Sequence, residues 1–163
     1  MLAFNEYGLL PPGKPIITSI DLFEKTFVTS FESEIRVSLF KHYQHYVAAL
    51  QAIIGSEFYQ WVDGSYVTKK ENPNDLDVVT FIDAAIAEKH KKQLKNFQYP
   101  NSVEKFNIDG YLVRVFDDNH PKRIAFQSDK LYWWHLFEKV KGLKSRKKLK
   151  KGFLEIHYKE DNL

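Results

Sequence analysis

The sequence predicts one α/β (α+β) domain in which helices pack on a mixed β-sheet of about four to five strands. Its 163 residues suit a single domain with a hydrophobic core of its own. Hydrophobic residues make up 44% and charged residues 28%, which is typical of a globular fold. Helical patterns alternate with short β-branched and aromatic runs, and no repeat or internal linker interrupts them, so residues 1–163 are taken as one domain.

The N-terminal third is predicted to be an extended segment followed by two helices. Residues 1–18 contain LLPPGKP, whose prolines lack backbone donors, so we expect an extended lead-in. Ser19 can then cap a short helix from Ile20 to about Val28. A longer helix is expected over Glu32 to Ile54, because its apolar residues recur every three or four positions, and Gly55 is suited to end it.

Two strands are expected on either side of a Gly-Ser turn. Glu57 to Asp63 is rich in aromatic and β-branched residues and ends at the pair Gly64-Ser65. Residues 66–74 form a loop or a short helical turn that closes with Asn-Pro-Asn. Leu76 to Ile82 is almost continuously apolar, which predicts an interior strand covered on both faces.

The second half of the chain is predicted to contain two helices and two further strands. Each helix has a polar residue that can cap it, Asp83 for the first and Ser128 for the second. The expected segments are a lysine-rich surface helix over Ala84 to Asn96, a strand over Lys105 to Phe116, a helix over Ser128 to Lys139, a basic loop over 139–151 and a strand over Phe153 to Tyr158.

Composition excludes several classes of chemistry. The chain has no cysteine, so disulfides, zinc–thiolate sites, iron–sulfur clusters and thiol nucleophiles are excluded. The N-terminus has no basic segment followed by a long apolar stretch, and no window approaches about eighteen apolar residues. We therefore expect no signal peptide, no membrane span and a cytoplasmic location.

The net charge of +3 conceals one strongly basic segment. Lys139 to Lys151 carries eight Lys or Arg residues and no acid, and the rest of the chain has a net charge of −5. The segment is either a solvated loop or a contact for a polyanion such as a triphosphate tail, a tRNA end or DNA. Aromatic residues, which mark single-strand binding, do not interrupt it. Both interpretations stay open.

Two carboxylates, Asp75 and Asp77, stand at the start of the apolar run Leu76 to Ile82. Their side chains would point to the same face of a strand, where each raises the pKa of the other unless a cation offsets their charge. A surface turn explains Asn-Pro-Asn-Asp but not Asp77 inside the apolar run. Carboxylate oxygens suit hard divalent cations, so Asp75 and Asp77 are predicted to bind Mg²⁺ (or Mn²⁺).

Gly64 and Ser65 precede these acids and suit an anion. Gly64 allows a tight turn, and Ser65 can offer its amide and hydroxyl to a phosphate, aided by any helical turn that begins there. Ser65 could serve only as a helix cap, which uses the same geometry. A phosphate site beside a metal site predicts a binding site for a nucleoside triphosphate.

The spacing of Gly-Ser, nine residues and Asp-Leu-Asp resembles the signature of the polymerase-β-like nucleotidyltransferase superfamily. The resemblance implies the nucleotidyltransferase fold, with Gly64 and Ser65 holding the triphosphate of a substrate such as ATP. It implies that Asp75 and Asp77 hold the metals, and that a third acid on a neighbouring strand completes the site and activates the attacking hydroxyl.

Asp109 in FNIDGYLVRVF is the best candidate for this third catalytic and metal-binding acid, with Glu104 as the alternative. Asp117 and Asp118 fit a turn better. Small members of the superfamily usually carry an arginine shortly after Gly-Ser. Here a lysine takes that place, and Lys69 is predicted to contact the phosphates.

Further blocks (LPPG, IDGY, DKLYWWHLF and KKGFLEI) resemble small prokaryotic nucleotidyltransferase-like proteins formerly described only as a domain of unknown function. This resemblance implies a toxin–antitoxin or phage-defence module in which a protein partner or tRNA is modified. Tyr132, Trp133 and Trp134 in the third block either stack on a nucleobase or belong to the core.

The expected function is metal-dependent transfer of a nucleoside monophosphate from an NTP to a hydroxyl of a protein or RNA. The alternative is a catalytically inactive subunit of the same fold that binds a protein partner or nucleic acid.

Overall fold

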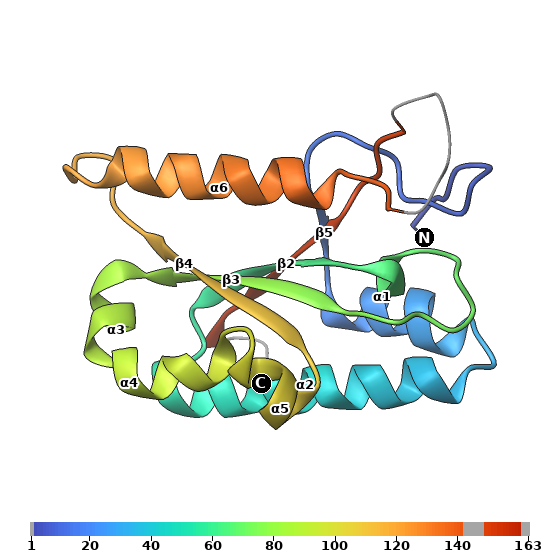
Figure 1. Ribbon diagram of the computed structural model, residues 1–163, viewed down its shortest axis with the longest axis horizontal. Coiled ribbons are helices and arrows are strands. Elements are labelled where there is room, and N and C mark those ends of the chain that lie inside the picture. The colour runs from blue at the N-terminus through green and yellow to red at the C-terminus, as the bar shows by residue number, and fades with distance from the viewer. Residues whose placement is uncertain (1, 142–148, 161–163) are drawn as a thin grey trace.

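The computed structural model describes residues 2–141 and 149–160. Figure 1 shows a central sheet with the long helix α6 (Arg123–Phe137) on one face and the other helices on the opposite face. The strands are β1 (Ile16–Thr18), β2 (Phe58–Asp63), β3 (Asp77–Asp83), β4 (Asp109–Val115) and β5 (Leu154–Tyr158). The remaining helices are α1 (Ile20–Glu24), α2 (Glu34–Ile54), α3 (Ala84–Lys89), α4 (Lys91–Leu94) and α5 (Asn101–Phe106).

The sheet is mixed, as the sequence predicts. Its strand order is β1-β5-β2-β3-β4. β2 runs antiparallel to β3 and β5, whereas β1 is parallel to β5 and β3 is parallel to β4. No helix in the described part of the chain is long and apolar enough to cross a membrane.

Two hydrophobic cores lie on the two faces of the sheet. On one face, the aromatic residues of α1 and α2, including Phe23, Tyr43 and Tyr46, pack against β2 and β3. On the other face, α6 covers a second cluster built around Trp61 and Phe81. β3 is therefore buried on both sides, which confirms the interior strand expected from its apolar run.

The first helices follow the predicted pattern closely. Ser19 caps α1 by accepting a hydrogen bond from the Leu22 amide, and a π-helix, η1 (Lys25–Thr29), continues it. α2 ends at Gly55, which has a positive φ of 81°. The lead-in expected to be extended is interrupted by a turn, in which the Gly8 amide donates to the Asn5 carbonyl. It ends in β1, a strand that the sequence analysis does not predict because three residues are too few to show an alternating pattern.

Three predicted boundaries in the second half are wrong. The helix assigned to 128–139 begins at Arg123, so Ser128 lies within α6 instead of capping it. Phe126 is buried, and this favours a helical conformation for the turn before Ser128. The strand assigned to 105–116 begins at Asp109, because residues 101–106 form α5. The surface helix over 84–96 is capped by Asp83 as predicted, but it breaks at His90 into α3, α4 and a 3₁₀ helix, η3 (Lys95–Phe97).

A fully buried arginine on α2 holds the loop that follows the Gly-Ser pair. The guanidinium of Arg36 donates hydrogen bonds to five backbone carbonyls, those of Phe27, Tyr66, Thr68, Lys70 and Glu71. Burial lowers the pKa of Arg36 to about 10, so the side chain is still charged at neutral pH. One side chain therefore fixes the path of residues 66–71 next to the end of β2.

Replacing this arginine is expected to destabilise the fold. Arg36→Met should lower the free energy of unfolding by about 3 kcal/mol or more, because several buried carbonyls lose their donors. Urea unfolding followed by circular dichroism measures the change. Lys41→Met, at an exposed position on the same helix, is the control and should change stability by less than about 0.5 kcal/mol. Similar losses in both variants would contradict the role assigned to Arg36.

Candidate functional site

A cavity of about 610 Å³ lies where β2 ends and β3 begins, beside the C-terminal end of α6. Four of the predicted residues line it, namely Gly64, Ser65, Asp75 and Asp77. Further lining residues include Asp63, four lysines (Lys70, Lys139, Lys141 and Lys151) and the aromatic residues Tyr7, Tyr111, Trp133 and Phe137. The cavity thus combines carboxylates, ammonium groups and aromatic rings.

Strand pairing aligns three carboxylates across the sheet. The register of β2 and β3 sets Asp63 opposite Asp77, and that of β3 and β4 sets Asp77 opposite Asp109. Residues that pair directly point to the same face of a sheet, so the three side chains lie in a row on the face covered by α6. Asp109 is not among the cavity-lining residues, although its strand position matches that of Asp77.

The carboxylates repel one another. Burial, followed by the negative charges of Asp75, Asp63 and Asp109, raises the pKa of Asp77 to about 7. Among the described residues, no group of three acidic or histidine side chains forms a ready-made metal centre. Asp77 is thus the carboxyl of the cavity whose ionised form is opposed by both burial and acidic neighbours, although four lysines line the same cavity.

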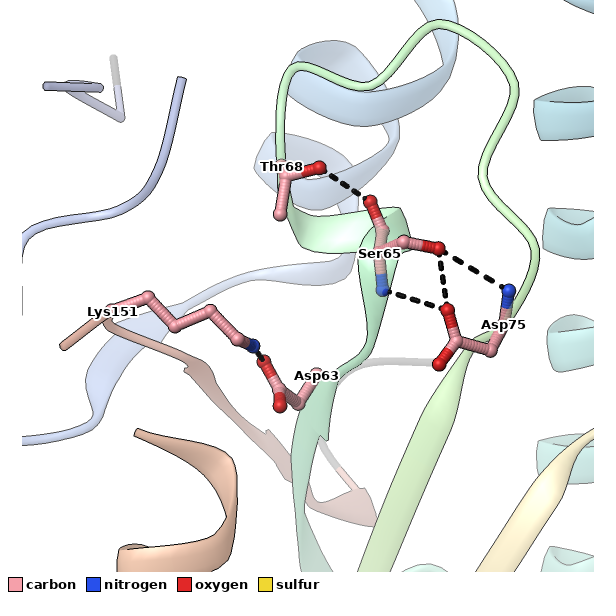
Figure 2. A network of polar contacts seen from close by, with 5 residues as sticks. All are labelled: Asp63, Ser65, Thr68, Asp75 and Lys151. Atoms are coloured by element: carbon pink, nitrogen blue, oxygen red, sulfur yellow. Dashed lines mark hydrogen bonds and ion pairs between the residues drawn. The ribbon is translucent and has the colours of Figure 1, made fainter. Parts of the chain in front are cut away.

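Ser65 is hydrogen-bonded to Asp75, as Figure 2 shows, and Gly64 packs against the backbone of Asp75. Gly64 has φ 88°, and a Cβ atom there would lie 2.7 Å from the Asp75 carbonyl oxygen, so this position requires glycine. Ser65 begins a 3₁₀ turn, η2 (Ser65–Val67). Its amide and hydroxyl both donate to Asp75 Oδ1, at 2.9 and 2.5 Å, and its Oγ accepts from the Asn74 amide at 2.9 Å.

These bonds affect both the carboxylate and the expected phosphate site. Burial acts to raise the pKa of Asp75, but the two hydrogen bonds from Ser65 outweigh it and leave the pKa below its ordinary value. Asp75 is therefore ionised at neutral pH. The Ser65 donors that the sequence assigns to a phosphate point at Asp75 instead, so an incoming anion would have to exchange with this carboxylate.

A buried ion pair between Lys151 and Asp63 closes the other side of the cavity (Figure 2). Both side chains are almost fully buried. Burial raises the pKa of Asp63 to about 6, although Lys151 counteracts the rise. The sequence analysis missed this pair. Asp63 directly precedes the Gly-Ser signature and could have been noticed there, whereas nothing distinguishes Lys151 from the other lysines of its basic segment.

The remaining predicted residues lie around or outside the cavity. The ammonium group of Lys69 lies 5.4 Å from the centre of the Phe4 ring, and Lys69 does not line the cavity. Its neighbour Lys70 does. Glu104, the alternative third acid, is exposed on α5. Asp118 lies in a turn after the far end of β4, as expected, and forms an ion pair with Arg123 at the start of α6. Of the basic loop over 139–151, residues 142–148 lie outside the described residues.

Comparison with known families places the chain in a family whose activity is not known. A family model described as a family of unknown function, DUF6932, matches residues 2–157. The chain belongs to the DUF6932 family. Comparisons with curated proteins and with solved structures give no match. The function of the cavity has to be argued from its own residues.

The ion pair makes a prediction about stability. Lys151→Met should lower the free energy of unfolding by about 3 kcal/mol, because it leaves Asp63 buried without its partner. The double variant Asp63→Asn, Lys151→Met should recover most of that loss. Lys150→Met, an exposed neighbour, is the control and should cost less than about 1 kcal/mol in urea unfolding. A double variant no more stable than Lys151→Met would contradict a specific pairing.

The raised pKa of Asp77 predicts a pH dependence. The folded protein retains a proton that the unfolded chain releases between pH 3.8 and about 7, so the free energy of unfolding should fall as pH rises through this window. Asp77→Asn should make the fall smaller by about 1 kcal/mol or more. Urea unfolding at several pH values, without divalent cations, measures it. Asp83→Asn, at the other end of β3, is the control and should leave the dependence of the unfolding free energy on pH unchanged. If this control also flattened the dependence, the effect could not be assigned to Asp77.

Proposed function

We propose that the protein is a metal-dependent nucleotidyltransferase of the polymerase-β-like type, which transfers a nucleoside monophosphate from an NTP to a hydroxyl of a protein or RNA acceptor. One observation carries the proposal. The paired aspartates Asp77 and Asp109 stand on adjacent strands, with Asp75 two residues before Asp77 and the Gly64-Ser65 turn packed against it. Paired acids beside a turn rich in donors are what a metal–triphosphate substrate needs.

The chemistry of the acids fits a divalent cation. Asp75, Asp77 and Asp109 offer only carboxylate oxygens, the donors preferred by Mg²⁺ and Mn²⁺. The pKa of Asp77 is raised first by burial and then by its acidic neighbours, and a bound cation would counter both effects by favouring the ionised carboxylate. These three residues would hold the metal. When bound, the metal would neutralise charge on the phosphates during the transfer.

The residues for the phosphates are Ser65 and the cavity lysines. Once Asp75 turns to the cation, the Ser65 amide and hydroxyl are free to donate to a phosphate oxygen. Lys70 and Lys151 line the same cavity and would offset the triphosphate charge. A phosphate contact by Lys69 stays a prediction, and the position of this side chain over the Phe4 ring does not favour it. ATP is the proposed donor.

In the proposed reaction, Asp109 accepts the proton of the acceptor hydroxyl. The hydroxyl oxygen then forms a bond to the α-phosphorus of the NTP. The bond between that phosphorus and the oxygen leading to the β-phosphate breaks, and pyrophosphate leaves with the electron pair. The protein mainly positions the groups and neutralises their charge, as in other phosphoryl-type transfers.

A second candidate is a catalytically inactive member of the same fold that binds nucleotide together with a protein partner or nucleic acid. Two observations favour it. Asp109 is not among the cavity-lining residues, and the donors of Ser65 are engaged by Asp75. In either case, the resemblance in sequence supports a role in a cytoplasmic toxin–antitoxin or antiviral defence module.

A transfer assay tests the leading proposal. Purified protein is incubated with each α-³²P-labelled NTP and Mg²⁺, together with total tRNA and candidate protein partners. Label should pass to an acceptor in the wild type, and Asp77→Asn should reduce it by about 100-fold or more, because Asp77 would hold the metal. Asp83→Asn, a matched change at the far end of β3, should keep full activity.

Equal labelling by wild type and Asp77→Asn would overturn the proposal. Thermal unfolding with NTP and Mg²⁺ separates the two candidates. An inactive subunit would be stabilised by the nucleotide in an Asp77-dependent way but would label no acceptor. A protein that neither binds an NTP nor transfers a nucleotide would exclude both.

A further inference from the structure

Four aromatic side chains from three parts of the chain form a continuous strip, here called the aromatic strip: Tyr99, Tyr111, Tyr132 and Trp133. Tyr99 stacks on Tyr111 with ring centres 6.2 Å apart. Tyr111 contacts Trp133 at 4.4 Å, and Trp133 contacts Tyr132 at 5.3 Å. Tyr99 follows η3, Tyr111 lies on β4, and the other two lie on α6, so only the fold brings them together.

The aromatic strip passes along the cavity and reaches the surface at both ends. Tyr111 and Trp133 line the cavity beside Asp77. Tyr99 and Tyr132 continue it outside, with 58% and 60% of their surface exposed. The phenol of Tyr111 is close enough to the acids for their charges to raise its pKa, after the larger effect of burial. The two middle rings of the strip, Tyr111 and Trp133, therefore lie at the proposed reaction centre, and the strip reaches solvent at both of its ends, Tyr99 and Tyr132.

The neighbouring tryptophan has a different role. Trp134 packs edge-on against Trp61 and Phe153, in the core between α6 and the sheet. The core interpretation of the YWW motif thus describes Trp134. It does not account for Tyr132, because a tyrosine ring mostly exposed on α6 gains little from packing.

Lysines stand beside the aromatic strip. Lys139 and Lys141 are exposed and line the same cavity as Tyr111 and Trp133. The basic segment lacks aromatic residues in sequence, but the fold places aromatic rings next to its first lysines. Aromatic rings combined with cations are the usual means of binding single-stranded nucleic acid, since bases stack on the rings and phosphates contact the cations.

We propose that the aromatic strip, with Lys139 and Lys141, binds the end of a single-stranded nucleic acid. A row of four rings is longer than one mononucleotide needs, because stacked nucleotides of one strand follow at about 3.4 Å. The adjoining ammonium groups favour a polyanion over an unstructured polypeptide. The terminal hydroxyl of this strand is then the acceptor; that step rests on the proposed function, whereas the binding itself does not.

The binding is tested without NTP. The probe is a fluorescently labelled RNA of about eight nucleotides with a free 3′ hydroxyl, followed by anisotropy at about 50 mM salt with and without Mg²⁺. Tyr99→Ala and Tyr132→Ala should each weaken binding by about 5- to 100-fold, the effect of losing one stacked base. Leu131→Ala is the matched control, because Leu131 is 57% exposed and adjoins Tyr132 on the same helix. It should leave the affinity unchanged.

The lysines are tested through salt dependence. In the double variant Lys139→Gln, Lys141→Gln, the slope of log affinity against log salt concentration should fall by about 1.4, or roughly 0.7 for each lost phosphate contact. The control Lys89→Gln, Lys92→Gln removes the same charge from α3 and α4, on the opposite face of the sheet (Figure 1), and should keep the slope of the wild type.

Three results would overturn the inference. One is equal affinity of Tyr132→Ala and Leu131→Ala for the RNA. Another is AMP competing as well as the oligonucleotide, which would reduce the strip to a site for one base. The third is transfer to a protein at a rate that Tyr99→Ala and Tyr132→Ala leave unchanged. RNA binding without any transfer would support the strip and count only against the proposed activity.

Discussion

The pairing of β2, β3 and β4 places carboxylates next to one another, and their repulsion is the constraint on which this end of the molecule depends. Two of the acids have specific partners. Asp63 is paired with the buried Lys151, and Asp75 accepts two hydrogen bonds from Ser65. Asp77, between them, has a pKa raised to about 7 because burial and its neighbours oppose its charge. An uncompensated carboxylate in a cavity costs stability and is typical of a binding or catalytic site.

The loop beside these acids is anchored from the other side of the sheet. Arg36 holds the carbonyls of residues 66–71, and Gly64 lets the chain pass within contact of Asp75 where any side chain would collide. The carboxylates and the Ser65 donors are therefore fixed by two different packed parts of the molecule, α2 and the sheet. Such preorganisation reduces the cost of positioning a substrate.

The sequence predicted the strands of this site better than their surroundings. β2 and β3 were found because apolar, β-branched runs ending in Gly-Ser or preceded by Asn-Pro-Asn leave a strong local signal. β1 was missed because three residues show no pattern, and α5 because its helical residues adjoin a clear strand. The start of α6 was placed five residues late, because the burial of Phe126 decides it and Ser128 only looked like a cap.

By itself, the sequence determined the Gly-Ser and Asp-x-Asp spacing, the exclusion of cysteine chemistry and the burial of β3, all of which depend on residues close together in the chain. Tertiary structure decided the rest. It set Asp63 and Asp109 on either side of Asp77, joined Lys151 to Asp63 across 88 positions, and turned Lys70 rather than Lys69 toward the cavity. The physical reason is that strand register and the packing of α6 bring distant residues together, and no local pattern encodes either.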